Sequence, residues 1–511
     1  MDVLGSLLGG FAVALTPANL AYALVGVVLG TAIGVLPGIG PALTISLLLP
    51  LTFTLDPVAA FIMFGGIYYG AMYGGSTTSI LVNTPGESAS VVTALDGYQM
   101  AKKGRAGAAL ATSAIGSFVA GTLATVGLML LAVILVQFAV RLGPPEYFAV
   151  MLLALAAVTS LAGMSVPKAA FATLLGLLLG MVGTDNQTGQ LRMTFGITEL
   201  EDGIDVVLGA IGLFAVGEVL WYAATLRSQR EEERQTIKGG VWMTPDEIRR
   251  SIPAWLRGSF IGFFIGVLPG AGATIASFIS YAIEKIVNPR RRFGTGVIEG
   301  VAGPEAANNA SAGGALVPLL GLGIPGSGTT AVMLAAFQIY GLQPGPLLFD
   351  QRPDLVWGLI ASLYIANAAL LVLNLPLVGI WVKLLDVPKP LLYSGILVIS
   401  SIGVYSIDRR ASDLAVVFVL GVLGYLMRRY DYPLAPVILG IVLGPLIDNN
   451  FRRAMILTDG SLLAIASRPG TTTILIGAVL FFALPFLLRF FARVTGKQEI
   501  AELVEADVGS R

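Results

Sequence analysis

The segment 106–139 carries no charged side chain, and this feature constrains the fold more than any other. As a helix rising about 1.5 Å per residue, it is long enough to cross the hydrocarbon core of a bilayer, about 30 Å thick. Other segments are apolar and nearly or fully long enough to do the same: 18–36, 145–163, 204–226, 354–382 and 471–488. We therefore expect an all-α polytopic membrane protein with about 10–12 transmembrane segments, partial crossings included. Their frequent glycines favour helices in close contact over a β-barrel.

The composition agrees with a membrane protein and excludes several functions. Of 511 residues, 55% are hydrophobic and 12% charged, against roughly 25% charged in soluble domains. Lys plus Arg equals Asp plus Glu at 31 each, so no bulk charge attracts nucleic acid. The absence of cysteine and histidine removes thiolate chemistry, the commonest metal ligand and the commonest proton shuttle. A coupled proton would therefore have to bind a carboxylate.

Two pairs of motifs recur in the same order. The first pair is GVLPGIGP at 34–41 and GVLPGAGA at 266–273, and the second is NTPGESAS at 83–90 and GIPGSGTT at 323–330. Aligning Pro37 with Pro269 also superposes four glycines at period four, Gly26, Gly30, Gly34 and Gly38, on Gly258, Gly262, Gly266 and Gly270. That period places them on one helix face, where backbones can approach closely. Two ordered pairs at nearly equal offsets indicate an internal duplication.

The charged loops predict that the two copies are inverted. In the first copy KKGR (102–105) follows the second motif, whereas in the second copy NPRRRFG (288–294) follows the first-motif helix. Short loops rich in Lys and Arg stay in the cytoplasm, so equivalent points of the copies lie on opposite sides of the membrane. We expect a first membrane repeat with following spans (1–226), a charged cytoplasmic linker (227–250), a second, inverted repeat with following spans (251–493) and a polar tail (494–511).

Proline and glycine inside such segments predict broken or re-entrant helices. Proline lacks the N–H and glycine relaxes φ, so the backbone leaves the helix and must be buried in protein or line a wet cavity. Inverted repeats with interrupted helices place a substrate site near the middle of the membrane. Hydroxyl residues after each break cap half-helices whose N–H groups suit a carboxylate, although such caps are also common in purely structural roles. The candidate substrate-binding residues are Pro37, Gly38, Ser76, Thr77, Thr78, Asn83, Thr84, Pro85, Gly86, Ser88, Gly270, Asn309, Ser311, Pro325, Gly326, Ser327, Thr329 and Thr330.

Ionisable side chains within spans are candidates for ion binding. Glu305, Asn308 and Asn309 would share one helical face and could present oxygens to a coupling ion such as Na⁺. The alternative is that Glu299 and Glu305 lie at the wet cytoplasmic end and pair with 290–292. In the span 204–226, Asp205 is near an end, whereas Glu218 lies deep enough to need a partner.

No motif for catalysis is present: the chain has no P-loop, no hydride-cofactor fingerprint and no paired base for a serine nucleophile. We therefore expect a secondary transporter rather than an enzyme, with no cofactor beyond a possible Na⁺. Two alternatives stay open at this point: a passive channel lined by the same breaks, and a membrane scaffold for partner subunits. Neither alternative needs two equivalent half-sites facing opposite sides of the membrane.

Five stretches of the chain carry a resemblance to a known family: GVLPGIGPALTISLLLPLTF, YYGAMYGGSTTSILVNTPGE, GVLPGAGATIASF, GPEAANNASAGGALVPLLGLGIPGSGTTAVML and GLQPGPLLF. Through these stretches the chain resembles the TctA family, the large membrane subunit of bacterial tripartite tricarboxylate transporters. The resemblance is weakest in the linker and the tail. It implies uptake of a carboxylate across the bacterial cytoplasmic (inner) membrane, coupled to a gradient of Na⁺ or H⁺. It also implies two partners, a small integral-membrane subunit and a periplasmic solute-binding protein. Tricarboxylates such as citrate, dicarboxylates and aromatic carboxylates are all open as substrates.

Overall fold

The computed structural model describes residues 2–36, 39–161, 165–185, 187–226, 235–237, 239–270 and 272–495, with backbone only at 407–408 and 484–495. The first repeat contains α1 (Val3–Ala14), α2 (Pro17–Val35), α3 (Pro41–Thr52), α4 (Pro57–Val82), the 3₁₀ turn η1 (Ser88–Ser90) and α5 (Val91–Lys102). It is followed by α6 (Ala106–Ala139), α7 (Pro144–Leu161), α8 (Val166–Gly180), the short antiparallel strands β1 (Gly183–Thr184) and β2 (Leu191–Arg192), η2 (Thr198–Leu200), α9 (Val206–Ala210), the π-helical turn η3 (Ile211–Val216) and α10 (Gly217–Thr225).

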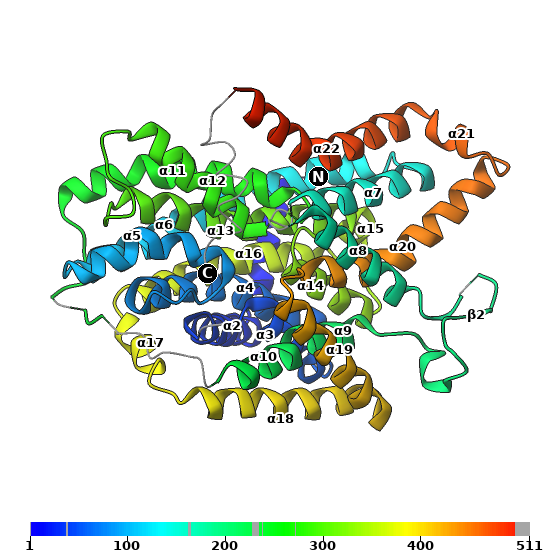
Figure 1. Cartoon of the computed structure of the whole chain (residues 1–511), viewed down its shortest axis with the longest axis horizontal. Helices are drawn as coiled ribbons and strands as arrows, with labels where there is room; N and C mark the ends of the chain where they lie inside the picture. Colours follow the sequence, from blue (N-terminus) through cyan, green and yellow to red (C-terminus); the bar gives the residue numbers. More distant parts are fainter. Residues whose placement is uncertain are drawn as a thin grey trace.

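The second repeat contains α11 (Pro245–Val267), α12 (Gly272–Val287), α13 (Glu299–Leu322) and α14 (Gly328–Ile339). It is followed by α15 (Pro346–Gln351), α16 (Pro353–Asn374), α17 (Val378–Leu384), α18 (Lys389–Asp408), α19 (Ala411–Arg429), α20 (Ala435–Leu457), α21 (Leu462–Ala466) and α22 (Pro469–Thr495). Figure 1 shows α5, α11 and α12 at one end of the molecule and the hairpin β1–β2 with α21 at the other.

The described helices confirm an all-α polytopic membrane protein. Six are long and apolar enough to cross a membrane: α2, α4, α6, the continuous segment α9–η3–α10, α16 and α19. The pair α17 and α18, bent by 89°, makes a seventh if it is one broken span. Shorter apolar helices of 10–17 residues have the length of partial crossings, namely α1, α3, α7, α8, α14 and part of α22. The predicted segment 106–139 coincides with α6, whereas 354–382 is interrupted after Asn374.

The glycines at period four pack one helix against another in both copies. A Cβ placed on Gly26, Gly30 or Gly34 of α2 would lie 2.3–2.5 Å from a backbone oxygen of α4. A Cβ on Gly258, Gly262 or Gly266 of α11 would lie 2.2–2.3 Å from a backbone oxygen of α13. In each pair the contacted residue number rises with the glycine number, so the two helices run parallel. The same close packing in both halves supports the duplication read from the sequence.

The two copies run in opposite directions. Ser76 of α4 contacts Glu305 of α13, while Gly313 of α13 faces the hydroxyl of Tyr69 on α4. As the residue number falls along α4 it rises along α13, so these equivalent helices are antiparallel. This arrangement agrees with the inversion that the charged loops predict.

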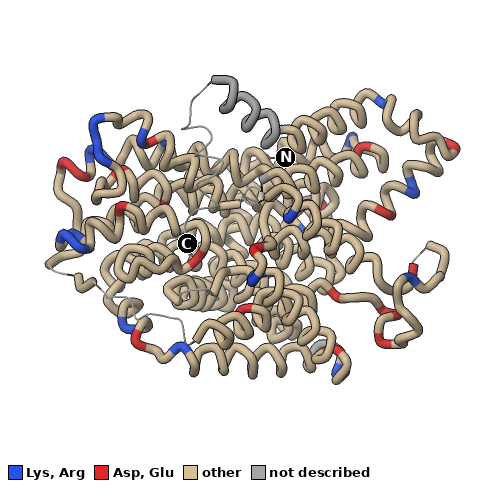
Figure 2. Tube along the Cα trace, viewed as in Figure 1, with Lys and Arg blue, Asp and Glu red and all other residues tan. Residues whose placement is uncertain are grey.

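The basic loops gather at the end of the molecule that carries α5, α11 and α12, where Figure 2 shows many of the Lys and Arg residues. Lys103 Nζ donates to the Thr295 carbonyl at 2.5 Å, and Arg105 pairs with Glu247. Glu299 pairs with Arg250 at 2.6 Å. The alternative raised in the sequence analysis, in which Glu299 pairs with residues 290–292, is therefore wrong. The loops predicted to be cytoplasmic are therefore neighbours in space.

Candidate functional site

The first break, 83–87, lies between α4 and η1. Asn83 ends α4 in the left-handed conformation, with φ of 61°. Glu87 is the N-cap of η1 and forms a capping box with Ser90, in which each side chain accepts from the other residue's backbone N–H. Gly86 packs so tightly that a Cβ there would lie 2.1 Å from the Gly34 carbonyl oxygen. We call residues 83–90 the first tip.

The second break repeats this geometry 240 residues later. Gly323 ends α13 with φ of 70°, and Ser327 is the N-cap of α14 in a capping box with Thr330. The Gly326 carbonyl accepts a hydrogen bond of 2.9 Å from the Gly270 amide, at the break between α11 and α12. We call residues 323–330 the second tip. The local fold that the motif pair predicted is thus present in both halves.

One expectation about the glycines is wrong. Gly86 and Gly326 were expected to relax φ, but neither adopts a positive φ. Among the described residues of the four motifs, the left-handed positions are Asn83, Gly270, Gly272 and Gly323. What Gly86 and Gly326 supply instead is room for a neighbouring backbone, because a Cβ would lie within 3.0 Å of backbone atoms at both.

Each tip contacts the long helix of the other copy. The Tyr68 hydroxyl on α4 lies 3.1 Å from the Ser327 hydroxyl of the second tip. Asn308 Nδ2 on α13 donates to Glu87 Oε1 of the first tip at 3.0 Å. We call these two interactions the crossed contacts. They bring residues of α4, α13 and both tips together at the boundary between the copies.

Glu305 is fully buried where four helices meet. Its carboxylate accepts hydrogen bonds from Ser76 of α4, Thr93 of α5 and Ser113 of α6. Among the described residues no Lys or Arg pairs with Glu305. The three hydroxyls supply the hydrogen bonds that water would give to an exposed carboxylate. This arrangement excludes the alternative in which Glu305 pairs at the wet end of the molecule.

The asparagines next to Glu305 point to different neighbours. Asn309 Nδ2 donates to Ser117 of α6 at 2.6 Å and to the Glu305 carbonyl, whereas Asn308 points to the first tip. The Oδ1 atoms of both asparagines are buried and have no hydrogen-bond partner among the described residues. Ser311 donates to the Asn308 carbonyl at 2.9 Å. The structure therefore does not gather Glu305, Asn308 and Asn309 around one point, and their role in ion binding stays a prediction.

Most of the other predicted site residues lie at the tips or within α4. Ser88 at the first tip accepts from Thr274 of α12 at 3.0 Å, which adds a contact between the copies. Thr77 and Thr78 are buried within α4, and Thr78 donates to the Val35 carbonyl. Thr84, Pro85, Pro325 and Thr329 belong to the tips themselves. Pro37 and Gly38 lie outside the described residues.

The N-terminus of α14 keeps free donors. The amide of Ser327 donates to Thr330 Oγ1 at 2.8 Å and the amide of Thr330 to Ser327 Oγ at 3.2 Å. The amides of Gly328 and Thr329 have no acceptor among the described residues. Free N–H groups at the positive end of a helix dipole favour an anion.

Two carboxylates of the predicted span 204–226 are explained by local structure. Glu218 pairs with Arg428 of α19, the partner that its depth in the span requires. Asp205 accepts from the Val207 amide at 2.6 Å and so caps the helix. Neither residue belongs to the crossed contacts.

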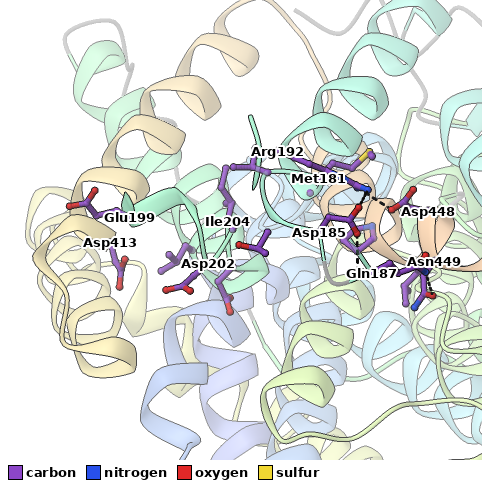
Figure 3. Close-up of a pocket in the computed structure, with 18 of the residues that line it drawn as sticks. Met181, Asp185, Gln187, Arg192, Glu199, Asp202, Ile204, Asp413, Asp448 and Asn449 are labelled. Carbon is purple, nitrogen blue, oxygen red and sulfur yellow. Dashed lines mark hydrogen bonds and ion pairs between the residues drawn. The ribbon is translucent and has the colours of Figure 1, made fainter. Parts of the chain in front are cut away.

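A pocket of about 630 Å³ lies beside the hairpin β1–β2, and no residue of either tip lines it. Arg192 lies between Asp185 and Asp448, at 2.6 and 3.0 Å (Figure 3). Hydrogen bonds from the Gln187 amide and the Thr188 hydroxyl, together with Arg192, hold the pKa of Asp185 well below its usual range. These ion pairs fasten the hairpin to α20, which is a structural role.

Comparison with known proteins decides the family. Residues 20–439 match the tripartite tricarboxylate transporter TctA family. The chain belongs to the TctA family. This is a family of transporters, so the TctA chain is a multi-pass membrane protein and the large subunit of a tricarboxylate transporter. No solved structure matches it.

Two relatives from Agrobacterium vitis are similar to this TctA chain. One, described as an uncharacterized 52.8 kDa protein in the TAR-I ttuC' 3' region, is 48% identical over 479 residues, which cover 93% of this chain and 94% of the relative. The other, an uncharacterized protein in the TAR-II ttuC' 3' region, is 46% identical over 216 residues, 42% of this chain and 89% of the relative.

The sequence did not predict several polar residues of the site in the TctA chain. Glu87 and Tyr68 each take part in one of the two crossed contacts. Thr93 and Ser113 are two of the three hydroxyl donors to Glu305. The repeat offset could have found Glu87, because it lies 240 residues before Ser327 in the aligned motifs. Thr93 and Ser113 lie outside the motifs, so nothing in the spacing indicated them.

Proposed function

We propose that this TctA chain takes up organic carboxylates across the bacterial inner membrane by alternating access at its two tips. The crossed contacts are the observation that carries the proposal. They join equivalent parts of two oppositely directed copies, which is the arrangement in which one bundle moves against the other around a central site. A passive channel and a scaffold have no use for two equivalent, inverted half-sites.

The second tip is the proposed carboxylate-binding part of the site. The free amides of Gly328 and Thr329 and the hydroxyl of Ser327 offer neutral donors to an anion, while the Thr330 hydroxyl donates to the Ser327 carbonyl within the cap. The described tip residues include no Lys or Arg, so selectivity among tricarboxylates, dicarboxylates and aromatic carboxylates would depend on the shape of the cavity. The predicted substrate residues of the first tip complete the site from the other copy.

A cation gradient of Na⁺ or H⁺ is the proposed energy source. Glu305, Asn308 and Asn309 are the candidate ion-binding residues carried forward from the sequence, and each asparagine leaves a buried Oδ1 atom without a hydrogen-bond partner among the described residues. The proposed partners are a small integral-membrane subunit and a periplasmic solute-binding protein.

Uptake into proteoliposomes tests the proposal. The chain and its small subunit would be reconstituted and given a labelled tricarboxylate, with and without the binding protein, under an imposed Na⁺ or H⁺ gradient. Accumulation that needs both the gradient and the binding protein is expected. Equilibration that ignores gradient and partner would contradict coupled transport and favour a channel.

A matched pair of variants tests the second tip. Ser327→Ala removes a cap at the proposed site, and Ser461→Ala removes the cap of α21, where Ser461 accepts from the Ala464 amide. Each change costs the helix about 1 kcal/mol. We expect Ser327→Ala to raise the KM for uptake and Ser461→Ala to leave it unchanged. Equal KM values would argue against substrate binding at the second tip.

A further inference from the structure

The two crossed contacts are equivalent positions of the repeat. Ser327 lies 240 residues after Glu87, and Asn308 lies 240 residues after Tyr68, the same offset that relates Pro85 to Pro325. Glu87 and Ser327 are both N-caps with extended backbone, and both take part in capping boxes. Each contact therefore joins the N-cap of one tip to the same point on the long helix of the other copy.

The two contacts differ in charge. Tyr68 and Ser327 are both neutral, whereas Asn308 contacts the carboxylate of Glu87. Among the described residues no Lys or Arg forms an ion pair with Glu87, which is only partly exposed. A carboxylate held away from water without a counter-charge is costly. Serine performs both the capping and the crossed contact in the second tip, so neither task explains a glutamate in the first.

One oxygen atom without a hydrogen-bond partner and one hydroxyl lie next to this carboxylate. Asn308 Oδ1 is on the same carboxamide as the Nδ2 that contacts Glu87, and it is buried with no hydrogen-bond partner among the described residues. The Ser88 hydroxyl follows Glu87 directly and is held by Thr274 of α12. Carboxylate, amide and hydroxyl oxygens are the ligands of hard cations, and a buried amide oxygen is costly without a partner.

Glu305 does not offer the same opportunity. Three hydroxyls from three helices already donate to its two carboxylate oxygens. The Asn308 carboxamide of the crossed contact donates one N–H to Glu87 and leaves its own oxygen unused. The unsatisfied oxygen therefore lies beside Glu87, at the boundary between the copies.

We propose that the Glu87 carboxylate, together with Asn308 Oδ1, binds the coupling cation at the first tip. This inference rests on the proposed function and refines it: Glu87 of the first tip takes the cation, beside the carboxylate substrate that the free donors of the second tip hold. Because the contact joins the two copies, a bound cation neutralises Glu87 where one copy meets the other. The charge at this boundary then depends on the gradient that drives transport.

Glu87→Gln tests the assignment, because the amide keeps the size and an acceptor oxygen but removes the charge. Two activities are measured in proteoliposomes. The first is accumulation of the carboxylate, driven either by a Na⁺ gradient at equal pH or by a pH gradient without Na⁺. The second is counterflow, which is the exchange of labelled for unlabelled carboxylate without any ion gradient. Glu201→Gln makes the same change in the segment between η2 and α9, which belongs to neither tip. It is expected to behave as the wild type.

We expect Glu87→Gln to lose accumulation under whichever gradient drives the wild type and still to catalyse counterflow. Unchanged gradient-driven accumulation would overturn the proposal. Loss of counterflow as well, in a variant present in the membrane at the wild-type level, would also overturn it, because Glu87 would then be needed for more than the cation. A wild-type protein with neither accumulation nor counterflow would instead contradict the proposed function itself.

Discussion

Alanine at the two tip glycines is expected to damage uptake to very different degrees. A Cβ at Gly86 would lie 2.1 Å from the Gly34 carbonyl oxygen, and ordinary contacts begin at 3.4 Å, so the atoms must separate by 1.3 Å. At Gly326 the nearest atom is Ala315 Cα at 2.9 Å, which requires only 0.5 Å. Both neighbours are backbone atoms, so the tip itself has to move.

A displacement of 1 Å in a binding site costs roughly 100-fold in rate, and forcing a methyl group into a packed site costs about 1–3 kcal/mol of stability. We therefore expect Gly86→Ala to lower the initial uptake rate per membrane-inserted molecule by about 100-fold, and Gly326→Ala by only a few-fold. Valine, with its branched Cβ, is expected to block uptake at either position. Gly9→Ala is the control, because nothing lies within 4 Å of that Cβ.

The assay compares initial rates of carboxylate uptake, each divided by the amount of monodisperse protein extracted from the membrane. Equal losses in Gly86→Ala and Gly326→Ala would refute the reasoning from close approach, since the two sites differ in the space they offer. A wild-type rate in Gly86→Ala would show that the first tip does not need its present position.

Three further predictions concern stability. Arg257→Ala leaves the buried Glu284 carboxylate without its partner at 2.6 Å, which we expect to cost about 3 kcal/mol and to lower the apparent Tm, with partial recovery in the double variant carrying Glu284→Gln. Thr93→Val removes a donor to Glu305 and should lower the Tm by the equivalent of about 1–3 kcal/mol, whereas Thr93→Ser should not. Because the pKa of Asp185 is depressed in the folded protein, the ionised Asp185 side chain stabilises the hairpin above the ordinary aspartate pKa, and this stabilisation disappears as the pH falls through the folded pKa. Hydrogen exchange of the β1–β2 amides should therefore rise over that acidic range. Asp185→Asn should remove this pH dependence.

The sequence was sufficient for the architecture because its signals were periodic or repeated. The charge-free run predicted α6 with its observed bounds, since neither end needed tertiary information. The glycines at period four predicted two tight helix pairs, and the distribution of Lys and Arg predicted the opposite directions of the copies. These features are local or follow from a simple rule of membrane insertion.

The site was predictable only where it repeats. The capping residues after the second Pro-Gly pair, Ser327 and Thr330, were found because two copies showed the same pattern, whereas Glu87, the cap of the first tip, was missed. The surroundings of Glu305 were not, because its hydroxyl donors come from three other helices and no spacing along the chain relates them. The reason for Gly86 and Gly326 was misjudged because a close approach by Gly34 or Ala315 is a tertiary contact, whereas a positive φ is a local property. The predicted span 354–382 ignored the break that follows Asn374, although Pro376 within it is a local signal for the end of a helix.

The crossed contacts also constrain how such a chain can have evolved. If two identical half-chains met in opposite directions, the interface would be isologous: position 68 of each half would contact position 87 of the other, and both contacts would have the same chemistry. A homodimer cannot place glutamate in one contact and serine in the other. A single gene that encodes both halves can, because each copy mutates independently. Fusion therefore permits a charge difference across an otherwise twofold interface, as Glu87 and Ser327 show.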